Sequence, residues 1–343
     1  MADAVRPVSA FLTVSSRSPF FSCQPVVARP SSRSFAPRIF AARLRIMAES
    51  DPVLDWIKGD GGATKILRSA PVGGGCISTA TRYDTDAGSF FVKTNWDTGP
   101  AMFEAEAAGL NAMHATGTIR VPKPLKVGPL SAYSRGSFII MEYIEMGSSR
   151  GNQAELGRQL AEMHKTSSSE KGFGFDVDNT IGSTPQKNPW TDDWITFFRD
   201  HRLGFQLQLI KDQYGDNDLY VKGQRLMERL PTLMKDLDNV RPCLLHGDLW
   251  SGNVATDAKG SPVVLDPACY YGHNEAEFGM SWCAGFGPSF YDAYFKVMPK
   301  QPGFEQRTEL YKLYHYLNHY NLFGSGYRGS CTSIINSYLA VAR

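Results

Sequence analysis

Apolar side chains recur along this chain at spacings that predict helices. Residues 100–117 place Phe103, Ala107 and Leu110 three or four positions apart, which is typical of a helix with one buried face. Pro100 suits the first turn of that helix. The same spacing recurs in three later segments, so the second part of the chain is expected to be mostly helical. These segments are residues 156–165, 191–210 and 307–323, the last of them strongly amphipathic.

Shorter apolar runs predict strands in the first part of the chain. Residues 51–70 are interpreted as a short helix and a lead-in, and residues 79–95 as two strands of a hairpin with its turn at residues 84–88. Residues 136–145, GSFIIMEYIE, indicate a buried strand that runs into a connector. The stretch MGSSRGNQ then has the composition of a linker, so a boundary between two lobes is expected near residue 146.

Three side chains that offer oxygen atoms as ligands occur in order in the stretch LLHGDLWSGNVATDAKGSPVVLDPA. Asp248 lies in a His-Gly-Asp turn, Asn253 follows five residues later, and Asp266 closes an apolar run. In phosphoryl transfer, this order supplies a proton acceptor followed by two oxygen ligands for Mg²⁺. Each piece alone is usually an ordinary turn, loop or strand end. Together and in this order they favour a catalytic site for phosphoryl transfer.

A glycine-rich loop and a lysine on a strand are the expected companions of such a site. Backbone N–H groups approach a phosphate closely where no Cβ intervenes. Lys93, in FFVKT, would reach the α- and β-phosphates, and the predicted helix 100–117 places Glu106 rather than Glu104 near its buried face. The alternative is that the glycines form an ordinary turn and that Lys93 and both glutamates are simply exposed to solvent. The predicted phosphate loop comprises Gly73, Gly74, Gly75, Cys76, Ile77 and Ser78.

Charge separates the first 46 residues from the rest of the chain. They hold seven Arg, no Lys and a single acid, Asp3, and so contribute +6, which leaves −4 for residues 47–343 of the net +2. A basic footprint for nucleic acid is therefore absent from the body of the protein, and no segment has the length of a membrane span. The Ser- and Arg-rich composition of residues 1–46 predicts a transit peptide, for the chloroplast first and the mitochondrion second.

The motifs resemble those of the fructosamine 3-kinase family, also called ketosamine kinases, and its plant members in particular. HGDLWSGN carries most of this resemblance, and further matches cover nearly everything after about residue 51. They are GGGCIS, YDTDAGSFFVK, MFEAEAAGL, VPKPLKVG, DDWITFFRDHRL, DPACYYGHNEAEFGM, PGFEQR and LYHYLNHYN.

The resemblance implies a fold and a set of roles. The fold would be α+β and two-lobed, similar to protein kinases and of the aminoglycoside phosphotransferase type, with an antiparallel sheet in an N-lobe (47–145) and helices in a C-lobe (146–343). Asp248 would accept the proton of the attacking hydroxyl, and Asn253 and Asp266 would bind Mg²⁺. Lys93 and Glu106 would orient the phosphates of ATP.

The resemblance also implies the partners of the site. The backbone of Glu142, Tyr143 and Ile144 would bind adenine, and Trp250 is a candidate to stack on a sugar. The substrates would be ketosamines, free or on glycated proteins, phosphorylated at the 3-hydroxyl so that the adduct is removed. Asp266 is followed by Pro267-Ala268 where protein kinases have Phe-Gly, so the phenylalanine switch of protein kinases is not expected.

Two other functions are compatible with parts of the pattern. One is a kinase of the same fold that acts on another small hydroxyl compound, such as choline or homoserine, but HGDLWSGN and LNHYN argue against it. The other is a pseudokinase that binds nucleotide as a redox sensor. Retention of Lys93, Asp248, Asn253 and Asp266 argues against a pseudokinase, because a binding module has no need of a proton acceptor.

Cysteine chemistry adds a regulatory hypothesis. Outside residues 1–46 the chain has five cysteines, Cys76, Cys243, Cys269, Cys283 and Cys331, and none forms a CxxC pair, so a zinc site is not expected. Cys76 follows three glycines in the predicted phosphate loop, where N–H groups and Lys93 would favour a thiolate. We therefore predict a redox switch in which Cys76 forms a disulfide with Cys76 of a second chain, and thus a homodimer. The alternative is an inert residue that packs under the loop.

Overall fold

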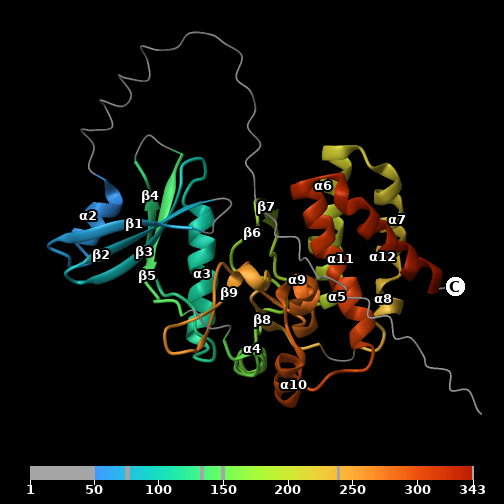
Figure 1. Cartoon of the computed structure of the whole chain (residues 1–343). Coiled ribbons are helices and arrows are strands. Elements are labelled where there is room, and N and C mark those ends of the chain that lie inside the picture. Colours follow the sequence, from blue (N-terminus) through green and yellow to red (C-terminus); the bar gives the residue numbers. More distant parts are fainter. Residues whose placement is uncertain (1–50, 74–77, 132–134, 148–150, 238–239, 342–343) are drawn as a thin grey trace, which may run out of the picture. The chain divides into compact units, whose positions relative to one another are not determined.

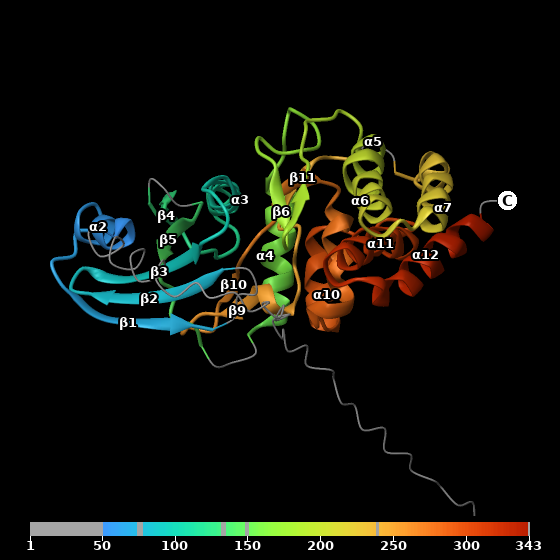
Figure 2. The ribbon, with the colours of Figure 1, turned by 90° about the horizontal axis from the view of Figure 1, so that it is seen from above.

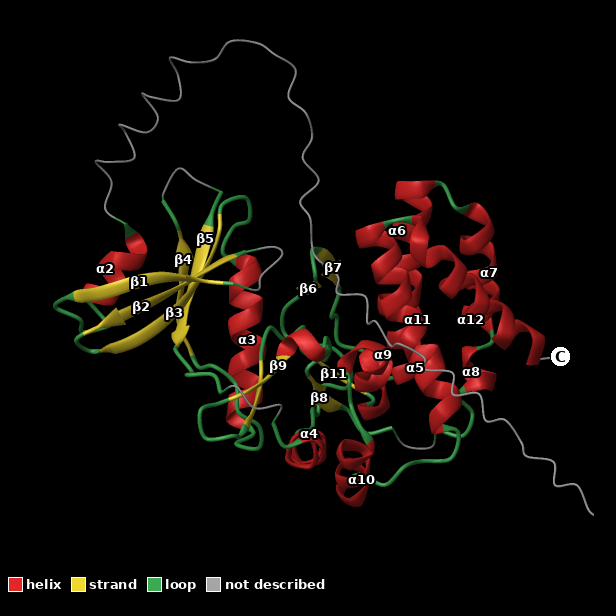
Figure 3. Cartoon of the chain, viewed as in Figure 1, coloured by secondary structure: helices red, strands yellow, loops and turns green. Residues whose placement is uncertain are grey.

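A five-stranded antiparallel sheet carries the predicted nucleotide-binding residues. The computed structural model describes residues 51–73, 78–131, 135–147, 151–237 and 240–341, which all lie in the compact unit Ala48–Arg343. The sheet has the order β1-β2-β3-β5-β4. Its strands are β1 (Ile66–Val72), β2 (Thr79–Thr85), β3 (Gly88–Asn95), β4 (Pro124–Pro129) and β5 (Ser137–Glu142). Figure 3 shows that the long strands belong to this sheet and that helices dominate the rest.

The remaining elements are mostly helical. Three further pairs of short antiparallel strands lie among them, namely β6 (Asn179–Ile181) with β7 (Thr184–Gln186), β8 (Cys243–Leu245) with β11 (Tyr270–Gly272), and β9 (Val254–Thr256) with β10 (Pro262–Val264). The helices are α2 (Pro52–Lys58), α3 (Ala101–Ala115), α4 (Gln153–Thr166), α5 (Trp194–Phe197), α6 (Phe205–Tyr214), α7 (Asn217–Glu228), α8 (Leu230–Leu233), α9 (Ser281–Ala284), α10 (Pro288–Val297), α11 (Phe304–Phe323) and α12 (Arg328–Val341). Single turns or irregular helices are η1 (Phe198–Gly204, a π-helix), η2 (Ser251–Asn253), η3 (Asn274–Met280) and η4 (Ser325–Tyr327).

The two faces of the sheet pack against different helices because successive side chains of a strand point to opposite sides. Phe90 and Val92 of β3 form a small core with Val53 and Ile57 of α2. The alternate side chains of β3 point to the opposite face of the sheet, which is covered by α3. This helix packs against β4 and β5 (Figures 1 and 2). Lys93 pairs with Ile139 across β3 and β5, and Ile139 belongs to the same core as Phe103 of α3. The alternation therefore directs Lys93 toward α3.

One sequence prediction about this sheet is wrong. We expected the glycine loop to precede the first strand, whereas β1 comes before it, so Pro71 and Val72 are strand residues and the loop connects β1 with β2. β1 lies at the sheet edge and most of its side chains are exposed. An edge strand does not need an apolar face, and it tolerates Pro71 because one side of its backbone has no partner strand. Its pattern is therefore not that of a buried strand.

Two predictions about the helices also need correction. Residues 191–210 were expected to form one helix, but the π-helix η1 separates α5 from α6. The C-terminal helix α11 was expected to be amphipathic, with Leu310, Leu313, Tyr314 and Leu317 on one side. Those four are buried, but so are residues on its other sides, because α11 packs against η3, α6 and α12.

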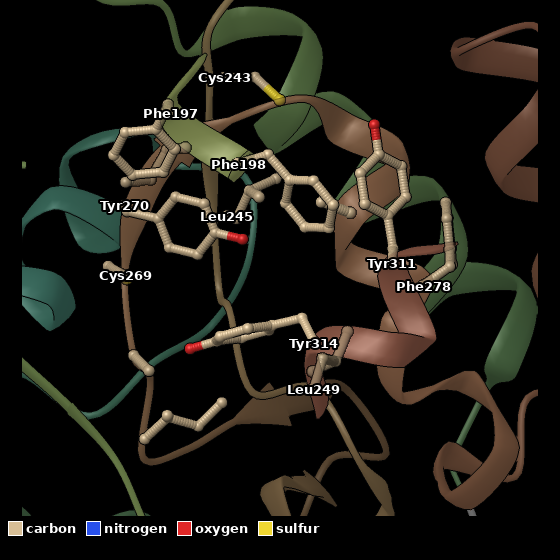
Figure 4. Close-up of a cluster of buried hydrophobic side chains, with 14 of the residues drawn as sticks. Phe197, Phe198, Cys243, Leu245, Leu249, Cys269, Tyr270, Phe278, Tyr311 and Tyr314 are labelled. Atoms are coloured by element: carbon tan, nitrogen blue, oxygen red, sulfur yellow. The ribbon is translucent and has the colours of Figure 1, made fainter. Parts of the chain in front are cut away.

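Aromatic side chains from several elements form the main core around β8 and β11 (Figure 4). The ring of Phe198 in η1 meets the edge of Tyr311 in α11 with 5.0 Å between centroids. Phe197 stacks on Tyr270, which follows the predicted metal ligand Asp266 by four residues. This core supports the segment that carries the polar motif. Among the described residues, none of the helices combines the length and apolar character that a membrane span requires.

Candidate active site

The catalytic motif begins where β8 ends, in a turn that only glycine can make. Gly247 has φ +81°, and a Cβ on it would lie 2.2 Å from the carbonyl oxygen of Ala268. A side chain at this position would therefore meet both backbone strain and a collision with main-chain atoms. The turn brings Asp248 directly beside the segment that holds Asp266.

Asp248 and Asn253 lie at the two ends of this loop, and the loop brings them into contact. The Nδ2 group of Asn253, at the end of η2, donates to the backbone carbonyl of Asp248 at 2.8 Å and lies 3.4 Å from its Oδ2. Burial and the negative charges of Asp266 and Glu277 raise the pKa of Asp248 to about 7, against the hydrogen bond from Asn253. A carboxylate that takes up a proton near neutral pH suits the role of proton acceptor.

Asp266, Lys93 and Glu106 form a charged cluster. The Nζ of Lys93 lies 2.6 Å from Oε1 of Glu106 and 2.5 Å from Oδ1 of Asp266. Asp266 has a positive φ of 53°, a conformation that non-glycine residues seldom adopt, although Asp does so more readily than most, and residues held in such conformations cluster at active sites. Elements far apart in the sequence thus deliver three charged groups to one point. The structure selects Glu106 over the exposed Glu104, as helical spacing predicted.

The protonation states of this cluster follow from its burial and its charges. Burial disfavours the charged form of Lys93, but Glu106 and Asp266 outweigh this effect and raise its pKa. Burial raises the pKa of Glu106, and the neighbouring ammonium of Lys93 opposes that rise. Lys93 is therefore held as a cation, which is the form that binds phosphate oxygens.

The predicted nucleotide contacts are only partly described. Gly74, Gly75, Cys76 and Ile77 lie outside the described residues, whereas Gly73 and Ser78 flank them at the ends of β1 and β2. The predicted adenine-binding residues are Glu142, Tyr143 and Ile144, and the structure describes all three.

At the predicted adenine site, some backbone and side-chain groups already have partners. The N–H of Glu142 donates to the carbonyl of Lys123 at 2.9 Å, so adenine recognition by that group would require exchange of this bond. The Tyr143 hydroxyl accepts a hydrogen bond from Arg82 at 2.9 Å. Ile144 is buried beyond the end of β5.

Trp250 is exposed at the edge of the catalytic loop. Its indole folds over Gly252, where a Cβ would lie 2.4 Å from the ring. The side chain is thus held against its own loop while 40% of its surface stays accessible to a ligand. The short helix α9, with the half-exposed Trp282, packs against η2 of the same loop.

The residues present fit a magnesium ion. The Asn253 side chain uses its nitrogen toward Asp248, which leaves its oxygen as the atom suited to a hard cation, and the Asp266 carboxylate is half exposed. Among the described residues no group of three or more His, Cys, Asp or Glu could form a metal site. Mg²⁺ usually takes only one or two protein carboxylates and fills its other positions with water and phosphate oxygens, so this small ligand set agrees with Mg²⁺.

The described cysteines are all free thiols. The apolar sequence around Cys243 and Cys269 predicts that they are buried. Both are buried in the structure, and burial raises the pKa of both. The apolar sequence around Cys283 predicts burial as well, but Cys283 is only half buried, on the short helix α9 beside the catalytic loop. Cys331 is buried in α12, and its pKa is raised by burial to about 12. None of these four has the character of a reactive thiolate.

Sequence reasoning missed one residue that touches the catalytic loop. Glu277 in η3 is buried and accepts hydrogen bonds from the backbone of His246 and Gly247. The stretch NEAEFGM contains two acids among apolar residues, and no local pattern distinguishes Glu277 from Glu275. The sequence predicts that His164 is a packed or surface histidine rather than a ligand. In the structure it is buried, with Nε2 3.2 Å from Glu277.

An antiparallel sheet with a paired lysine and a loop that presents Asp248, Asn253 and Asp266 together define a phosphotransferase with a kinase-like α+β fold. The chain belongs to the fructosamine kinase family, whose model matches residues 52–341.

Relatives and solved structures agree with this assignment. The chain is 64% identical over 317 residues to a chloroplastic protein-ribulosamine 3-kinase of Oryza sativa subsp. indica, with 92% of each chain covered. It is 60% identical to the protein of the same name in Arabidopsis thaliana, over 97% of this chain and 100% of the relative. The structure of a candidate fructosamine-3-kinase from Haemophilus somnus 129PT matches with a TM-score of 0.72 and 25% identity over 84% of this chain and 97% of the other.

A more distant likeness concerns the fold alone. A thermostable variant of the aminoglycoside phosphotransferase APH(4)-Ia, in complex with AMP-PNP and hygromycin B, matches with a TM-score of 0.58 and 16% identity over 83% of this chain and 97% of the other. The expected family, the kinase-like α+β fold and the phosphotransferase class are thereby confirmed. The chain is a chloroplast protein, as its first 46 residues predicted.

Proposed function

We propose that this chain transfers the γ-phosphoryl group of ATP to the 3-hydroxyl of ketosamines, with ribulosamine and erythrulosamine adducts on protein amines as the main substrates and fructosamine as a further one. The observation that carries the proposal is the meeting of Lys93, Asp266 and Asp248 in one site within a chain of the fructosamine kinase family. The names of the rice and Arabidopsis relatives support ribulosamine as the sugar.

Each side chain of the site has a distinct task in the proposed reaction. Asp248 accepts the proton of the 3-hydroxyl as its oxygen attacks the γ-phosphorus. Lys93, oriented by Glu106, neutralises phosphate oxygens of the nucleotide. Asn253 and Asp266 would hold Mg²⁺, which supplies positive charge to the phosphates. Trp250 offers an exposed aromatic surface to the sugar. Positioning and charge neutralisation suffice, because phosphoryl transfer needs no covalent group from the protein.

The product explains why such a reaction would remove a sugar from a protein. A ketosamine carries its amine on the carbon next to a ketone, and the 3-hydroxyl lies on the ketone's other side. Phosphorylation converts this hydroxyl into a good leaving group. Elimination of phosphate from the enolised adduct leaves an imine, and water hydrolyses this imine to a carbonyl compound and the free amine. Neither step needs the enzyme, so the proposed role of the protein is deglycation.

We also propose redox control through Cys76, on the basis of its place in the sequence. Two Cys76 thiols would lose two electrons and two protons to a peroxide and form one disulfide between two chains, which would hold the phosphate loops of a homodimer away from nucleotide. A Cys76→Ala protein should then keep its activity and its monomer band in a non-reducing gel after peroxide treatment. Loss of activity in that protein, regained with reductant, would contradict the proposal.

The test of the main activity uses the full chain, reduced, with ATP, Mg²⁺ and a ribulose-modified lysine. ADP release should be saturable in the ketosamine and should fall by about 10³-fold or more in Asp248→Asn, since that variant lacks the proton acceptor. Retained binding of ATP in the variant would confirm that it is folded. Absence of turnover in the wild-type protein despite ATP binding would favour the other-substrate or pseudokinase functions instead.

A further inference from the structure

A buried carboxylate accepts hydrogen bonds from the backbone of the catalytic loop. Glu277 lies in η3, and its side chain is fully shielded from solvent. Its Oε2 accepts the N–H of His246 at 2.7 Å and its Oε1 accepts the N–H of Gly247 at 2.9 Å. These are the two residues directly before Asp248. Hydrogen bonds from backbone N–H groups to a carboxylate are among the stronger ones in proteins.

The carboxylate of Glu277 also belongs to a network of buried polar side chains. His164 of α4 places Nε2 3.2 Å from Oε2 of Glu277 and Nδ1 2.8 Å from the hydroxyl of Tyr294. That hydroxyl in turn accepts from Nδ2 of Asn274 at 3.0 Å. With a proton on Nε2, the His164 ring donates to Glu277, and its Nδ1 lies within hydrogen-bond distance of the Tyr294 hydroxyl. Burial alone would raise the pKa of Glu277, but His164, His246 and the backbone donors lower it.

His246 connects Glu277, through hydrogen bonds, to Asp248 and to the residues on either side of Asp266. Its Nε2 donates to the carbonyl of Leu265 at 2.8 Å, and its Nδ1 lies 3.3 Å from the N–H of Asp248. Its own carbonyl accepts the N–H of Ala268 at 2.8 Å. These bonds bracket Asp266 on both sides, where the backbone adopts its positive φ. The same segment thus holds the glycine turn at Gly247 and the positive φ of Asp266, which is unusual for a residue with a side chain.

We propose that Glu277 is a positioning residue for phosphoryl transfer, which acts through the backbone of His246 and Gly247 to hold Asp248 against the acceptor hydroxyl. The proposal rests on the proposed role of Asp248. A shift of this loop by a fraction of an ångström would lengthen the path of the proton, and misplacement on the scale of 1 Å costs about 100-fold in rate. Lys93 and the adenine site belong to other elements, and the Asp266 segment is also held by the hydrogen bond from the Leu265 N–H to the Asn253 carbonyl at 2.9 Å and by the ion pair with Lys93, so nucleotide binding should be affected little.

The chain offers a matched control two residues away. Glu275 lies in the same element and is equally buried, but the guanidinium of Arg307 binds both of its oxygens at 2.6 and 2.7 Å. Both carboxylates are thus fully engaged, one by the catalytic loop and one by a structural ion pair. Replacement of either by Gln preserves its shape and removes one acceptor oxygen.

The experiment measures kcat and KM for ATP and for the ketosamine in full-length Glu277→Gln and Glu275→Gln proteins, at a temperature where urea titration finds both folded. In Glu277→Gln the amide NH₂ faces one of the two loop N–H groups, so kcat should fall about 10- to 100-fold with KM for ATP within about twofold. Glu275→Gln should lose stability but keep kcat within about twofold. Equal losses of kcat in the two variants would overturn the proposal.

A milder variant keeps the proposal testable where Glu277→Gln does not fold. Tyr294→Phe removes the donor to His164 and leaves the carboxylate in place, so kcat should fall by about three- to tenfold with KM for ATP unchanged. An unchanged kcat in Tyr294→Phe, with Glu277→Gln unfolded, would count against Glu277 as a positioning residue. Failure of the proposed function itself has a separate signature, since the wild-type protein and Asp248→Asn would then release ADP at the same rate.

Discussion

The buried imidazole of His315 should make the protein sensitive to mild acid. His315 lies in α11 with its ring against Gly279, and within the described part of the chain its Nδ1 has no hydrogen-bond partner. Burial, together with the charges of His319 and Arg202, lowers the pKa of His315 from 6.5 to about 3. The folded protein therefore holds this histidine neutral, whereas the unfolded chain protonates it below about pH 6.5.

The magnitude follows from the two pKa values. A group with a lowered pKa in the folded state costs stability as the pH falls below its unfolded value, because the unfolded state then binds the extra proton. Between about pH 6.5 and pH 5 the loss is about 1.4 kcal/mol per pH unit, which gives about 2 kcal/mol for His315. Total stabilities of domains are only about 5–15 kcal/mol, so a difference of this size is readily measured.

The assay compares His315→Leu with the wild-type protein by urea unfolding at about pH 7.5 and about pH 5. The difference in free energy of unfolding, variant minus wild type, should rise by about 2 kcal/mol at the lower pH, because only the wild type retains the titrating ring. Other groups, including Asp248 with its raised pKa, contribute equally to both proteins and cancel. Equal m-values at both pH values serve as the control for two-state unfolding. A difference that does not change with pH would refute the reasoning.

Two substitutions test the packing of the helices. Gly157→Ala in α4 would place its Cβ 2.2 Å from the backbone carbonyl of Phe290 in α10, so it should lower the free energy of unfolding by about 3 kcal/mol. Gly329→Ala in α12 places its Cβ in open space, so it should raise the free energy of unfolding by up to about 1 kcal/mol. Urea titration checks both, and equal effects would contradict the helix contact. Arg307→Met should cost about 3–5 kcal/mol by leaving Glu275 buried and unpaired, measured as a lower Tm; an unchanged Tm would contradict that ion pair.

The predictions from sequence succeeded where the deciding information is local. Helical spacing places Phe103, Leu110 and Met113 on one side of α3, and those side chains are buried. The same spacing puts Glu106 at the edge of that side, and strand alternation turns Lys93 toward it. Both periods are properties of the backbone itself, so they can be read before any tertiary contact is known.

The predictions failed where a neighbour decides the conformation. The strands β1 and β4 lie at the two edges of the sheet and owe their structure to hydrogen bonds with β2 and β5 rather than to an apolar pattern. The π-helix η1 interrupts a segment that has helical composition throughout. It contains Arg202, a fully buried guanidinium that lies 4.0 Å from the ring of Tyr270 and donates to Asn188. These partners come from distant parts of the chain.

The sequence by itself determined the chemical groups of the candidate site and their order, because Asp248, Asn253 and Asp266 carry a recognisable pattern of oxygen ligands over a short stretch. Only the tertiary structure decided how those groups are held. Glu277 and His164 are separated by 113 residues, yet they meet beneath the catalytic loop. A contact of this kind depends on how helices and strands pack against each other, and no local period along the chain encodes that packing.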